Sequence, residues 1–251
     1  KILKQFKPEY IVNFAAQSMV AQSWEFPQHW INTNALAITN LINVLKDYDR
    51  LEKFIQVTTP EVYGSTSIKI SENAAIQPST PYAVSRAAGD MMLKIYQERF
   101  GLPVNFTRAA NVYGPGQQLY RIIPRTILAC LTGQKLVLDG GGISERAFIH
   151  IDDVSSATLK IAQSKVNGET FHISTDEFVS IRKLVKKIVD MTGANFDAVV
   201  TTGEERLGKD QAYFLDSNKI RTLFNWTDTI SLEQGVEETI SWVRDNLDVL
   251  Q

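Results

Sequence analysis

Short apolar runs and longer segments with helical spacing alternate along the first half of the chain. Residues 10–16 and 53–59 are short and rich in apolar and β-branched side chains, which predicts buried strands. Residues 29–48 repeat apolar side chains at helical intervals, and residues 80–101 are predicted as a long helix that ends at Gly101. Residues 102–116 are predicted as a strand that runs into a loop of glycine and proline.

The second half repeats this alternation with shorter strands and longer connections. Helices are predicted at 122–134, 152–164, 180–193 and 231–247, and strands at 135–140, 146–151 and 169–174. Ser180 and Ser231 are typical N-cap residues. Alternating strands and helices predict a parallel sheet with crossover helices, the doubly wound α/β class. The change after about residue 115 indicates a second, smaller lobe that is interleaved with the first.

The amino-acid composition excludes some classes of protein but does not identify a function. The 251 residues are 44% hydrophobic and 22% charged, which is ordinary for a globular protein with a sizeable core. The net charge of −2 gives no reason to expect nucleic acid or an anionic membrane as a partner. No apolar run reaches the length of roughly 18 residues that predicts a transmembrane helix. Cys130 is the single cysteine, so a disulfide within the chain is excluded and a reducing compartment, the cytoplasm, is predicted.

A tyrosine and an arginine share one face of the predicted helix 80–101. Tyr82 and Arg86 lie at positions i and i+4. A tyrosine has an ordinary pKa of about 10. To act as a base near neutral pH it needs a nearby cation that favours the phenolate. Arg86 is therefore a candidate for that cation, although an isolated pair of this kind is more often a solvated helix surface.

Polar groups follow the predicted strand 53–59. Thr59 lies at the end of that strand, where ligands bind in parallel sheets, and Glu61 comes two residues later. The alternative for Thr59 is that it is present only because threonine favours β-strands. The alternative for Glu61 is that it is an acidic residue of a solvated loop. A Gly-rich turn between a first strand and a first helix, which would receive a dinucleotide pyrophosphate, is not found in the sequence.

Several segments, taken in their order, resemble the extended short-chain dehydrogenase/reductases that act on nucleotide sugars. They are NFAAQS (13–18), TTPEVYG (58–64), Tyr82-x-x-x-Arg86, RAANVYGPG (108–116), ISERAFIHIDDV (143–154) and EERLGKD (204–210). Within that family the chain is most similar to dTDP-glucose 4,6-dehydratase, and next to GDP-mannose 4,6-dehydratase. The resemblance implies a Rossmann-type fold, bound NAD and a nucleotide-diphosphate sugar as substrate.

In that family an N-terminal segment carries the Gly-rich turn. The sequence is therefore expected to lack this segment. Residues 1–115 are expected to be the remainder of the NAD-binding domain, without its first βαβ units. Residues 116–251 are expected to form mainly the nucleotide-sugar-binding lobe.

The resemblance also implies roles for the catalytic candidates. Tyr82 would take the proton from O4 of the sugar, and Thr59 would hydrogen-bond the same hydroxyl. Arg86 stands where the family has lysine; it keeps the charge but is bulkier and planar. Glu61 would remove the C5 proton before water leaves from C6. The dTDP-glucose enzymes carry an aspartate before this glutamate, and here Pro60 takes its place, so one carboxylate would serve both steps.

The same resemblance assigns the binding residues. Those expected to contact NAD are Asn13, Ala15, Ala16, Tyr82 and Arg86. Those expected to contact the nucleotide sugar are Gln17, Ser18, Thr59, Asn111, Arg121, Arg146 and Arg206. The three histidines do not have the spacing of a metal site. A homodimer through the Tyr82 helix is expected from the same family.

Two alternatives remain open at this level. A nucleotide-sugar 4-epimerase or a UDP-glucuronate decarboxylase of the same family shares most of these residues. A non-catalytic homologue that only binds nucleotide sugars is favoured by Arg86 and by the absence of a Gly-rich turn. The chemical identity of the product would distinguish the first alternative from a dehydratase. Binding of the nucleotide sugar without turnover would indicate the second alternative.

Overall fold

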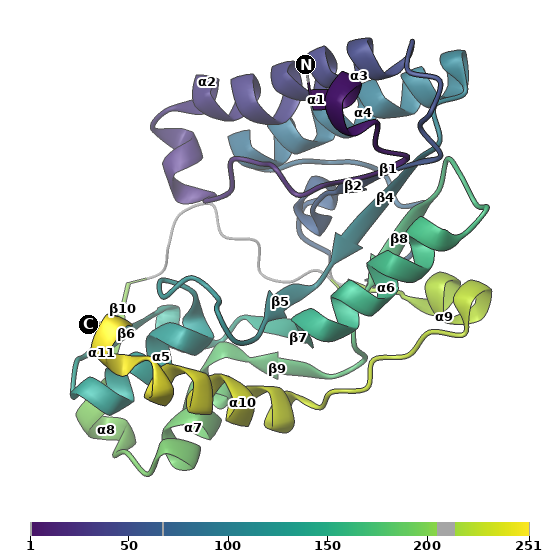
Figure 1. The fold of residues 1–251 in the computed structure, drawn as a ribbon. Coiled ribbons are helices and arrows are strands. Elements are labelled where there is room, and N and C mark those ends of the chain that lie inside the picture. The colour runs from purple at the N-terminus through teal and green to yellow at the C-terminus, as the bar shows by residue number, and fades with distance from the viewer. Residues whose placement is uncertain (1, 67, 205–213, 251) are drawn as a thin grey trace. The chain divides into compact units, whose positions relative to one another are not determined.

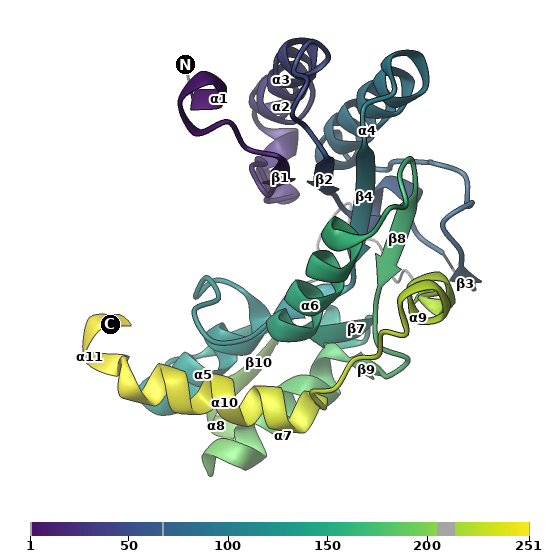
Figure 2. The ribbon, with the colours of Figure 1, turned by 45° about the vertical axis from the view of Figure 1, so that its right-hand side comes forward.

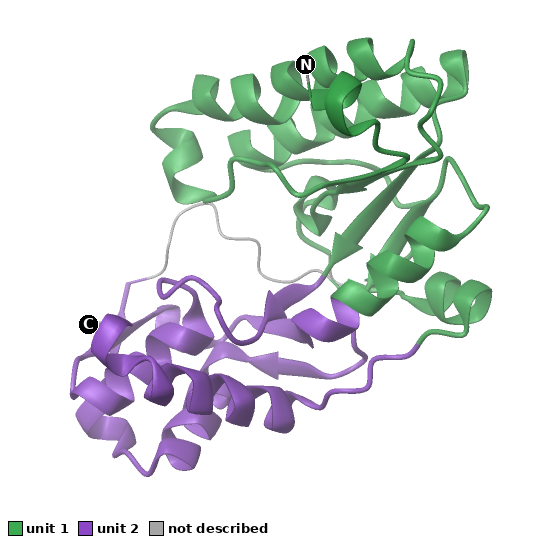
Figure 3. Ribbon diagram, in the orientation of Figure 1, with its two compact units in different colours: residues 1–109, 155–173, 213–226 green, residues 110–154, 174–212, 227–251 purple. Residues whose placement is uncertain are grey.

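A computed structural model describes residues 2–66, 68–204 and 214–250 of the chain and divides it into two compact units (Figure 3). Unit 1 comprises residues 1–109, 155–173 and 213–226, and unit 2 comprises residues 110–154, 174–212 and 227–251. The chain therefore leaves unit 1 at Ala109 and returns to it twice. No helix in the described ranges combines the length and the apolar character that crossing a lipid bilayer requires.

Unit 1 contains a sheet of four parallel strands (Figure 1). They are β1 (Tyr10–Asn13), β2 (Lys53–Val57), β4 (Val104–Ala109) and β8 (Thr170–Ile173), in the order β1-β2-β4-β8. Asn13 is paired with Gln56, and Val57 with Thr107. The carboxyl ends of these strands consequently meet at one edge of the sheet, as the predicted class requires.

Helices cover one face of this sheet (Figure 2). They are α2 (Pro27–Trp30), the π-helical segment Ile31–Leu36, α3 (Ala37–Leu45) and α4 (Pro81–Phe100). The predicted helix 29–48 is thus present but contains a π-helical turn, and the predicted helix 80–101 is α4, closed by Gly101 in the left-handed conformation. The core between helices and strands consists of Ile38, Ile42, Leu45, Phe54, Leu93, Leu102, Val104 and Phe106.

Smaller elements complete unit 1. α1 (Ile2–Phe6) precedes β1, and 3-10 helices span Ala21–Trp24 and Pro60–Tyr63. The short strands β3 (Lys69–Ile70) and β11 (Phe214–Leu215) pair in parallel. α6 (Ile151–Gln163) begins in unit 2 and continues into unit 1, and α9 (Asn218–Phe224) contacts β8.

The prediction of a buried strand at 10–16 was wrong in its burial and its length. β1 spans Tyr10–Asn13 only, and the side chains of Tyr10 and Val12 are 48% and 37% exposed. Ile11 points the other way and packs against the core under α3 and α4. β1 is at the edge of the described sheet, and successive side chains of a strand face opposite sides, so only one side of it is covered. The apolar run alone gave no indication of which side that would be.

Unit 2 has two small sheets and its own core. β5 (Asn111–Tyr113) pairs in parallel with β7 (Glu145–His150), which pairs antiparallel with β9 (Phe178–Ser180). β6 (Leu136–Asp139) pairs with β10 (Val200–Gly203). The predicted strand 102–116 is therefore two strands, β4 and β5, which belong to different units.

The helices of unit 2 pack around these sheets. They are α5 (Ile122–Thr132), α7 (Ile181–Thr192), α8 (Phe196–Val199), α10 (Leu232–Asp245) and α11 (Leu247–Leu250), with a 3-10 turn at Gly140–Gly142. Ser180 and Ser231 cap α7 and α10 as predicted. The main core joins α5, α7 and α10 through Ile123, Ile127, Leu184, Ile188, Val236 and Ile240.

Candidate active site

The candidate site in unit 1 is built at the carboxyl edge of the parallel sheet. β1 ends at Asn13, whose amide nitrogen donates to Gln56 Oε1 at 2.9 Å and whose Oδ1 accepts from the backbone N–H of Ala15 at 3.2 Å. Asn13 thereby turns the chain as it leaves the sheet. Ala15 is exposed and Ala16 is half-buried, and neither side chain extends beyond Cβ.

Asn34 holds the next part of this loop. Its Oδ1 accepts from the backbone N–H of Gln17 at 2.8 Å, and its Nδ2 donates to the backbone carbonyl of Gln17 at 2.9 Å. The same nitrogen donates to Ser85 Oγ on α4 at 2.9 Å. Asn34 thus fixes Gln17, and the adjacent half-buried Ser18, relative to α4. Nothing in the sequence analysis singled out this buried asparagine.

The segment after β2 carries Thr59 and Glu61. Thr59 is the N-cap of the 3-10 helix Pro60–Tyr63, and its Oγ1 accepts from the backbone N–H of Glu61 at 3.3 Å. Pro60 occupies the first helical position, where an N–H would have no partner within the helix. Thr59 is buried and Glu61 is half-buried.

Two hydroxyl groups fix the start of α4, where Tyr82 lies. Thr80 Oγ1 accepts from the N–H of Ala83 at 3.1 Å, and Ser23 Oγ accepts from the N–H of Tyr82 at 3.1 Å. These bonds satisfy two of the N–H groups that a helix start leaves unpaired. Sequence analysis did not identify Ser23, because its partner is far away in the chain.

Tyr82 and Arg86 are both buried, with 8% and 5% of their surface exposed. The alternative of a solvated pair on a helix surface is therefore excluded. The guanidinium of Arg86 donates to the backbone carbonyl of Val57, the last residue of β2. Burial raises the pKa of Asp90, and the guanidinium groups of Arg108 and Arg86 oppose that effect.

The structure adds two charged residues that the sequence analysis did not name. Asp90 follows Arg86 by four residues, so that Tyr82, Arg86 and Asp90 lie along one face of α4. Asp90 Oδ2 accepts from Thr58 Oγ1 at 2.9 Å and from Arg108 of β4 at 3.1 Å. The helical spacing was a usable signal for Asp90. The pairing of Asp90 with Arg108 depends on where β4 lies in the sheet, and no local sequence pattern indicates it.

Three other predicted residues lie in unit 2. Asn111 Nδ2 donates to the carbonyl of Ala147 at 3.1 Å and so joins β5 to β7. Arg146 is half-buried on β7 and donates to the carbonyl of Glu145 at 2.7 Å. Arg121 is exposed at the start of α5, with its guanidinium carbon 5.4 Å from the centre of the Tyr120 ring. Arg206 lies outside the described residues.

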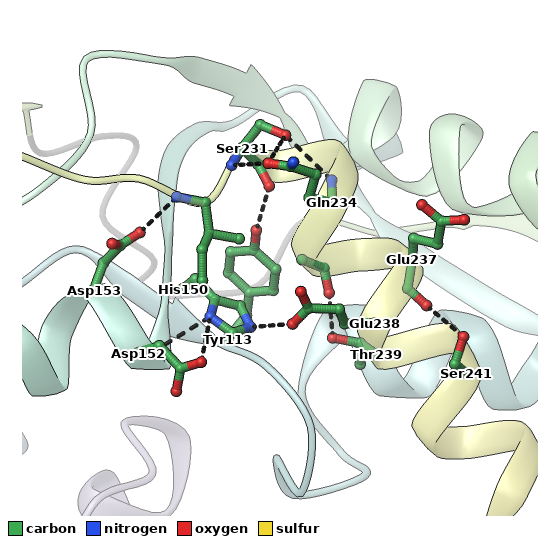
Figure 4. A network of polar contacts seen from close by, with 12 residues as sticks. Tyr113, His150, Asp152, Asp153, Ser231, Gln234, Glu237, Glu238, Thr239 and Ser241 are labelled. Atoms are coloured by element: carbon green, nitrogen blue, oxygen red, sulfur yellow. Dashed lines mark hydrogen bonds and ion pairs between the residues drawn. The ribbon is translucent and has the colours of Figure 1, made fainter.

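A polar network in unit 2 includes Tyr113, the last residue of β5, and His150, the last residue of β7 (Figure 4). His150 Nδ1 accepts from the N–H of Asp152 at 3.4 Å, and its Nε2 lies 3.5 Å from a carboxylate oxygen of Glu238. The hydroxyl of Tyr113 donates to the carbonyl of Ser231 at 3.4 Å, and burial raises its pKa. A Cβ on Gly235 would come within 2.4 Å of that hydroxyl, so glycine lets α10 approach.

Unit 1 therefore carries a phenol, a threonine hydroxyl and a carboxylate on two elements that hydrogen bonds join to each other. Arg86 and Asp90 tie α4 to the end of β2, from which Thr59 and Glu61 follow directly. These groups can hold a hydroxyl and move protons. Among the described residues, no cluster of histidine, cysteine, aspartate and glutamate could hold a metal ion.

Comparison with known proteins gives one family. The family model described as GDP-mannose 4,6 dehydratase matches residues 1–239. A dTDP-glucose 4,6-dehydratase of Streptomyces niveus is 32% identical over 237 residues, which are 94% of this chain and 70% of that protein. The crystal structure of a dTDP-glucose 4,6-dehydratase from Streptomyces venezuelae with NAD bound matches with a TM-score of 0.92 and 31% identity, over 97% of this chain and 75% of that one.

A longer relative shows how much of a whole protein can lie outside the match. A trifunctional UDP-glucose 4,6-dehydratase, epimerase and reductase of Arabidopsis thaliana is 30% identical over 240 residues. The match covers 94% of this chain and 36% of that protein. Because the family model extends over nearly all of the chain, the chain belongs to the GDP-mannose 4,6-dehydratase family.

Proposed function

We propose that the protein is an NAD-dependent nucleotide-sugar 4,6-dehydratase, with dTDP-glucose or a related nucleotide hexose as substrate. The observation that carries this proposal is the attachment of α4 to the end of β2. It sets the buried Tyr82 on one element and Thr59 and Glu61 on the other, at the edge of the sheet where ligands bind. Two of the relatives named above are dTDP-glucose 4,6-dehydratases.

The residues at this edge fit a dinucleotide. The small side chains of Ala15 and Ala16 leave the backbone after β1 accessible, and Asn13 holds that backbone in place. Tyr82 and Arg86 would hold the nicotinamide ribose, and Arg86 would supply the positive charge for which the family uses lysine. NAD, when bound, would accept the hydride of C4 and return it to C6.

Tyr82 and Thr59 are the groups for the first chemical step. The hydroxyl of Thr59 orients O4 of the sugar, and the Tyr82 phenolate takes the O4 proton. The buried position of both side chains excludes water from that proton transfer. The cation of Arg86 on the same helix face favours the phenolate.

Glu61 is the group for elimination. Once C4 is a ketone, the C5 proton is acidic, and the Glu61 carboxylate removes it. The resulting carboxyl then gives a proton to the C6 hydroxyl, which leaves as water. Pro60 carries no proton to donate, so Glu61 performs both transfers.

The nucleotide sugar would be held by the residues that the family motifs assign to it. Gln17 and Ser18 would face the sugar, and their loop is fixed by Asn34. Asn111, Arg121, Arg146 and Arg206 would bind the nucleotide diphosphate, where arginine suits phosphate oxygens through paired N–H groups. These assignments rest on the match to family motifs.

The quaternary structure that we propose is a homodimer through α4. Val84, Met91 and Ile95 lie on one face of α4 and are 45%, 52% and 53% exposed. Leu36 and Val44 add exposed apolar side chains on the neighbouring helical segment. A second copy of the chain would cover these side chains.

Replacement of Glu61 by glutamine tests the proposed function. Glu61→Gln keeps the shape of the side chain and loses the base, so substrate should still reduce NAD and NADH should accumulate. Absorbance at the NADH band in the complete protein measures this, with Glu9→Gln, at an exposed position immediately before β1, as the matched control. Normal formation of a 4-keto-6-deoxy sugar by the glutamine variant would contradict the assignment.

The same experiment separates the alternatives. A 4-epimerase has no need of Glu61 and would release an epimer without a 6-deoxy product. A protein that only binds its ligands would retain NAD and sugar with no reduction of NAD in either the parent or the variant.

A further inference from the structure

A buried ion pair lies beneath the segment that carries Thr59 and Glu61. Arg108 of β4 donates to Asp90 of α4 at 3.1 Å, and both side chains are at most 5% exposed. Neither residue is among the groups assigned above to the sugar or to NAD. Removing charges from water is costly, so a buried pair of this kind needs further hydrogen bonds to be maintained.

The first of these bonds anchors the beginning of the segment. Thr58 Oγ1 donates to Asp90 Oδ2 at 2.9 Å. Thr58 immediately precedes Thr59, and its backbone N–H is bound to the carbonyl of Thr107 at 2.9 Å. Both the backbone and the side chain at residue 58 are therefore fixed.

The second bond anchors the end of the segment. Arg108 donates to the hydroxyl of Tyr63, the last residue of the 3-10 helix, and its guanidinium carbon lies 4.6 Å from the centre of the tyrosine ring. Thr58 and Tyr63 thus hold the segment at both ends on one ion pair. Glu61 lies between the two anchors.

His172 of β8 completes the network. Its Nδ1 lies 3.2 Å from the carbonyl of Asp216, and its Nε2 lies 2.8 Å from the Tyr63 hydroxyl. Because a carbonyl only accepts, Nδ1 carries the proton and Nε2 accepts from Tyr63. Burial lowers the pKa of His172 to about 3, so the ring is neutral at physiological pH. The hydroxyl of Tyr63 consequently has a donor on one side and an acceptor on the other.

We propose that Asp90 and Arg108, acting through Thr58 and Tyr63, are positioning residues that hold the Glu61 carboxylate for elimination. This inference rests on the proposed role of Glu61. A short 3-10 helix has few internal bonds, and its side chains would otherwise sample several positions. A misplacement of about 1 Å at a reacting group can cost on the order of 100-fold in rate.

Two conservative variants test the proposal in the complete protein. Tyr63→Phe and Thr58→Val each delete one anchoring hydroxyl and leave the ion pair intact, which avoids the folding failure expected when one partner of a buried pair is removed. Tyr48→Phe and Thr39→Val are matched controls, because their hydroxyls donate to the carbonyls of Pro8 and Ala35 at 2.9 Å within the same unit.

The readout separates the two chemical steps. NADH appearance after substrate addition reports oxidation at C4, and deuterium uptake at C5 from heavy water reports proton removal by Glu61. We expect Tyr63→Phe to slow exchange at C5 about tenfold or more while oxidation at C4 changes less than about twofold. A residue that only stabilises the fold would lower the melting temperature and leave this ratio unchanged.

A double variant links the effect to Glu61. In the Glu61→Gln background, Tyr63→Phe should cause no further loss of exchange, because residues that act through one group are not additive. If folded Tyr63→Phe and Thr58→Val proteins exchange C5 at the parental rate, the positioning role is wrong. If Glu61→Gln itself exchanges C5 normally, the proposed function has failed instead.

Discussion

At the scale of single residues, Pro60 suits the backbone at its position independently of any role in catalysis. It is buried at the first position of the 3-10 helix, where the lack of an N–H costs nothing and the fixed φ of proline favours the turn. The same position accepts aspartate, which is favoured at helix starts. Proline therefore suits the helix start but brings no proton donor to the proposed site.

We expect Pro60→Asp to accelerate elimination. A buried carboxyl retains its proton more readily than an exposed one, and such a group could protonate the leaving C6 hydroxyl. General acid assistance is typically worth about 100-fold or more, so a gain of about tenfold should be measurable as faster disappearance of NADH in a single turnover. An unchanged rate in a folded variant would show that Glu61 already supplies this proton efficiently.

His172 should make stability depend on pH. Its pKa is about 3 in the folded protein and about 6.5 when unfolded, so the unfolded chain binds more protons between these values. The contribution of His172 to stability is therefore fully present above the pKa that it has in the unfolded chain, and it is lost as the pH falls. We expect the contribution of this histidine to drop by about 2 kcal/mol between pH 7 and pH 5.

Urea unfolding of the parent and of His172→Gln at both pH values measures this contribution. Glutamine can accept from Tyr63 and donate to the Asp216 carbonyl without titrating. The free energy of unfolding of the variant should therefore fall less than that of the parent over the same interval. Equal losses in the two proteins would refute the link to His172.

At the scale of elements, α4 and the π-helical segment Ile31–Leu36 approach each other so closely that their backbones are in contact. Gly89 faces Asn34, and a Cβ on Gly89 would lie 2.4 Å from the Asn34 carbonyl oxygen. Asn34 is also the residue that binds Gln17 and Ser85. Close approach of these helices thus determines where the Gln17 loop lies relative to Tyr82.

Gly89→Ala should be destabilising, although alanine is favoured over glycine within helices by about 1 kcal/mol. The methyl group cannot be accommodated unless α4 shifts away from Asn34. We expect a lower melting temperature and slower oxidation at C4, since Tyr82 is on the same helix. A higher melting temperature would mean that helix propensity outweighs the contact.

At the scale of the whole molecule, the exposed face of α4 predicts the oligomeric state. Met91→Glu with Ile95→Glu places two like charges in the proposed dimer interface, and burial of unpaired charges opposes association. Sedimentation velocity should show the parent as a dimer and the double variant as a monomer. Leu223→Glu on α9 is a control, since Leu223 is also an exposed apolar side chain. A monomeric parent would contradict the proposal.

The sequence by itself determined the elements with strong local signals and supplied the candidate site residues at their ends. α4, α5, α7 and α10 follow from apolar periodicity, glycine ends and serine caps. Thr59, Glu61 and Tyr82 followed from strand ends, helical spacing and the order of motifs. These signals act over a few residues, so they can be read without knowing the fold.

Only the tertiary structure decided which partners those residues have. The exposure of β1, the division of 102–116 between two units and the bonds of Arg86 to Val57 could not be predicted. The same is true of Tyr63, which reaches Arg108 of β4 and His172 of β8 across the sheet. Such contacts depend on strand order and register, and periodicity tells which side chains share a face but not what covers that face.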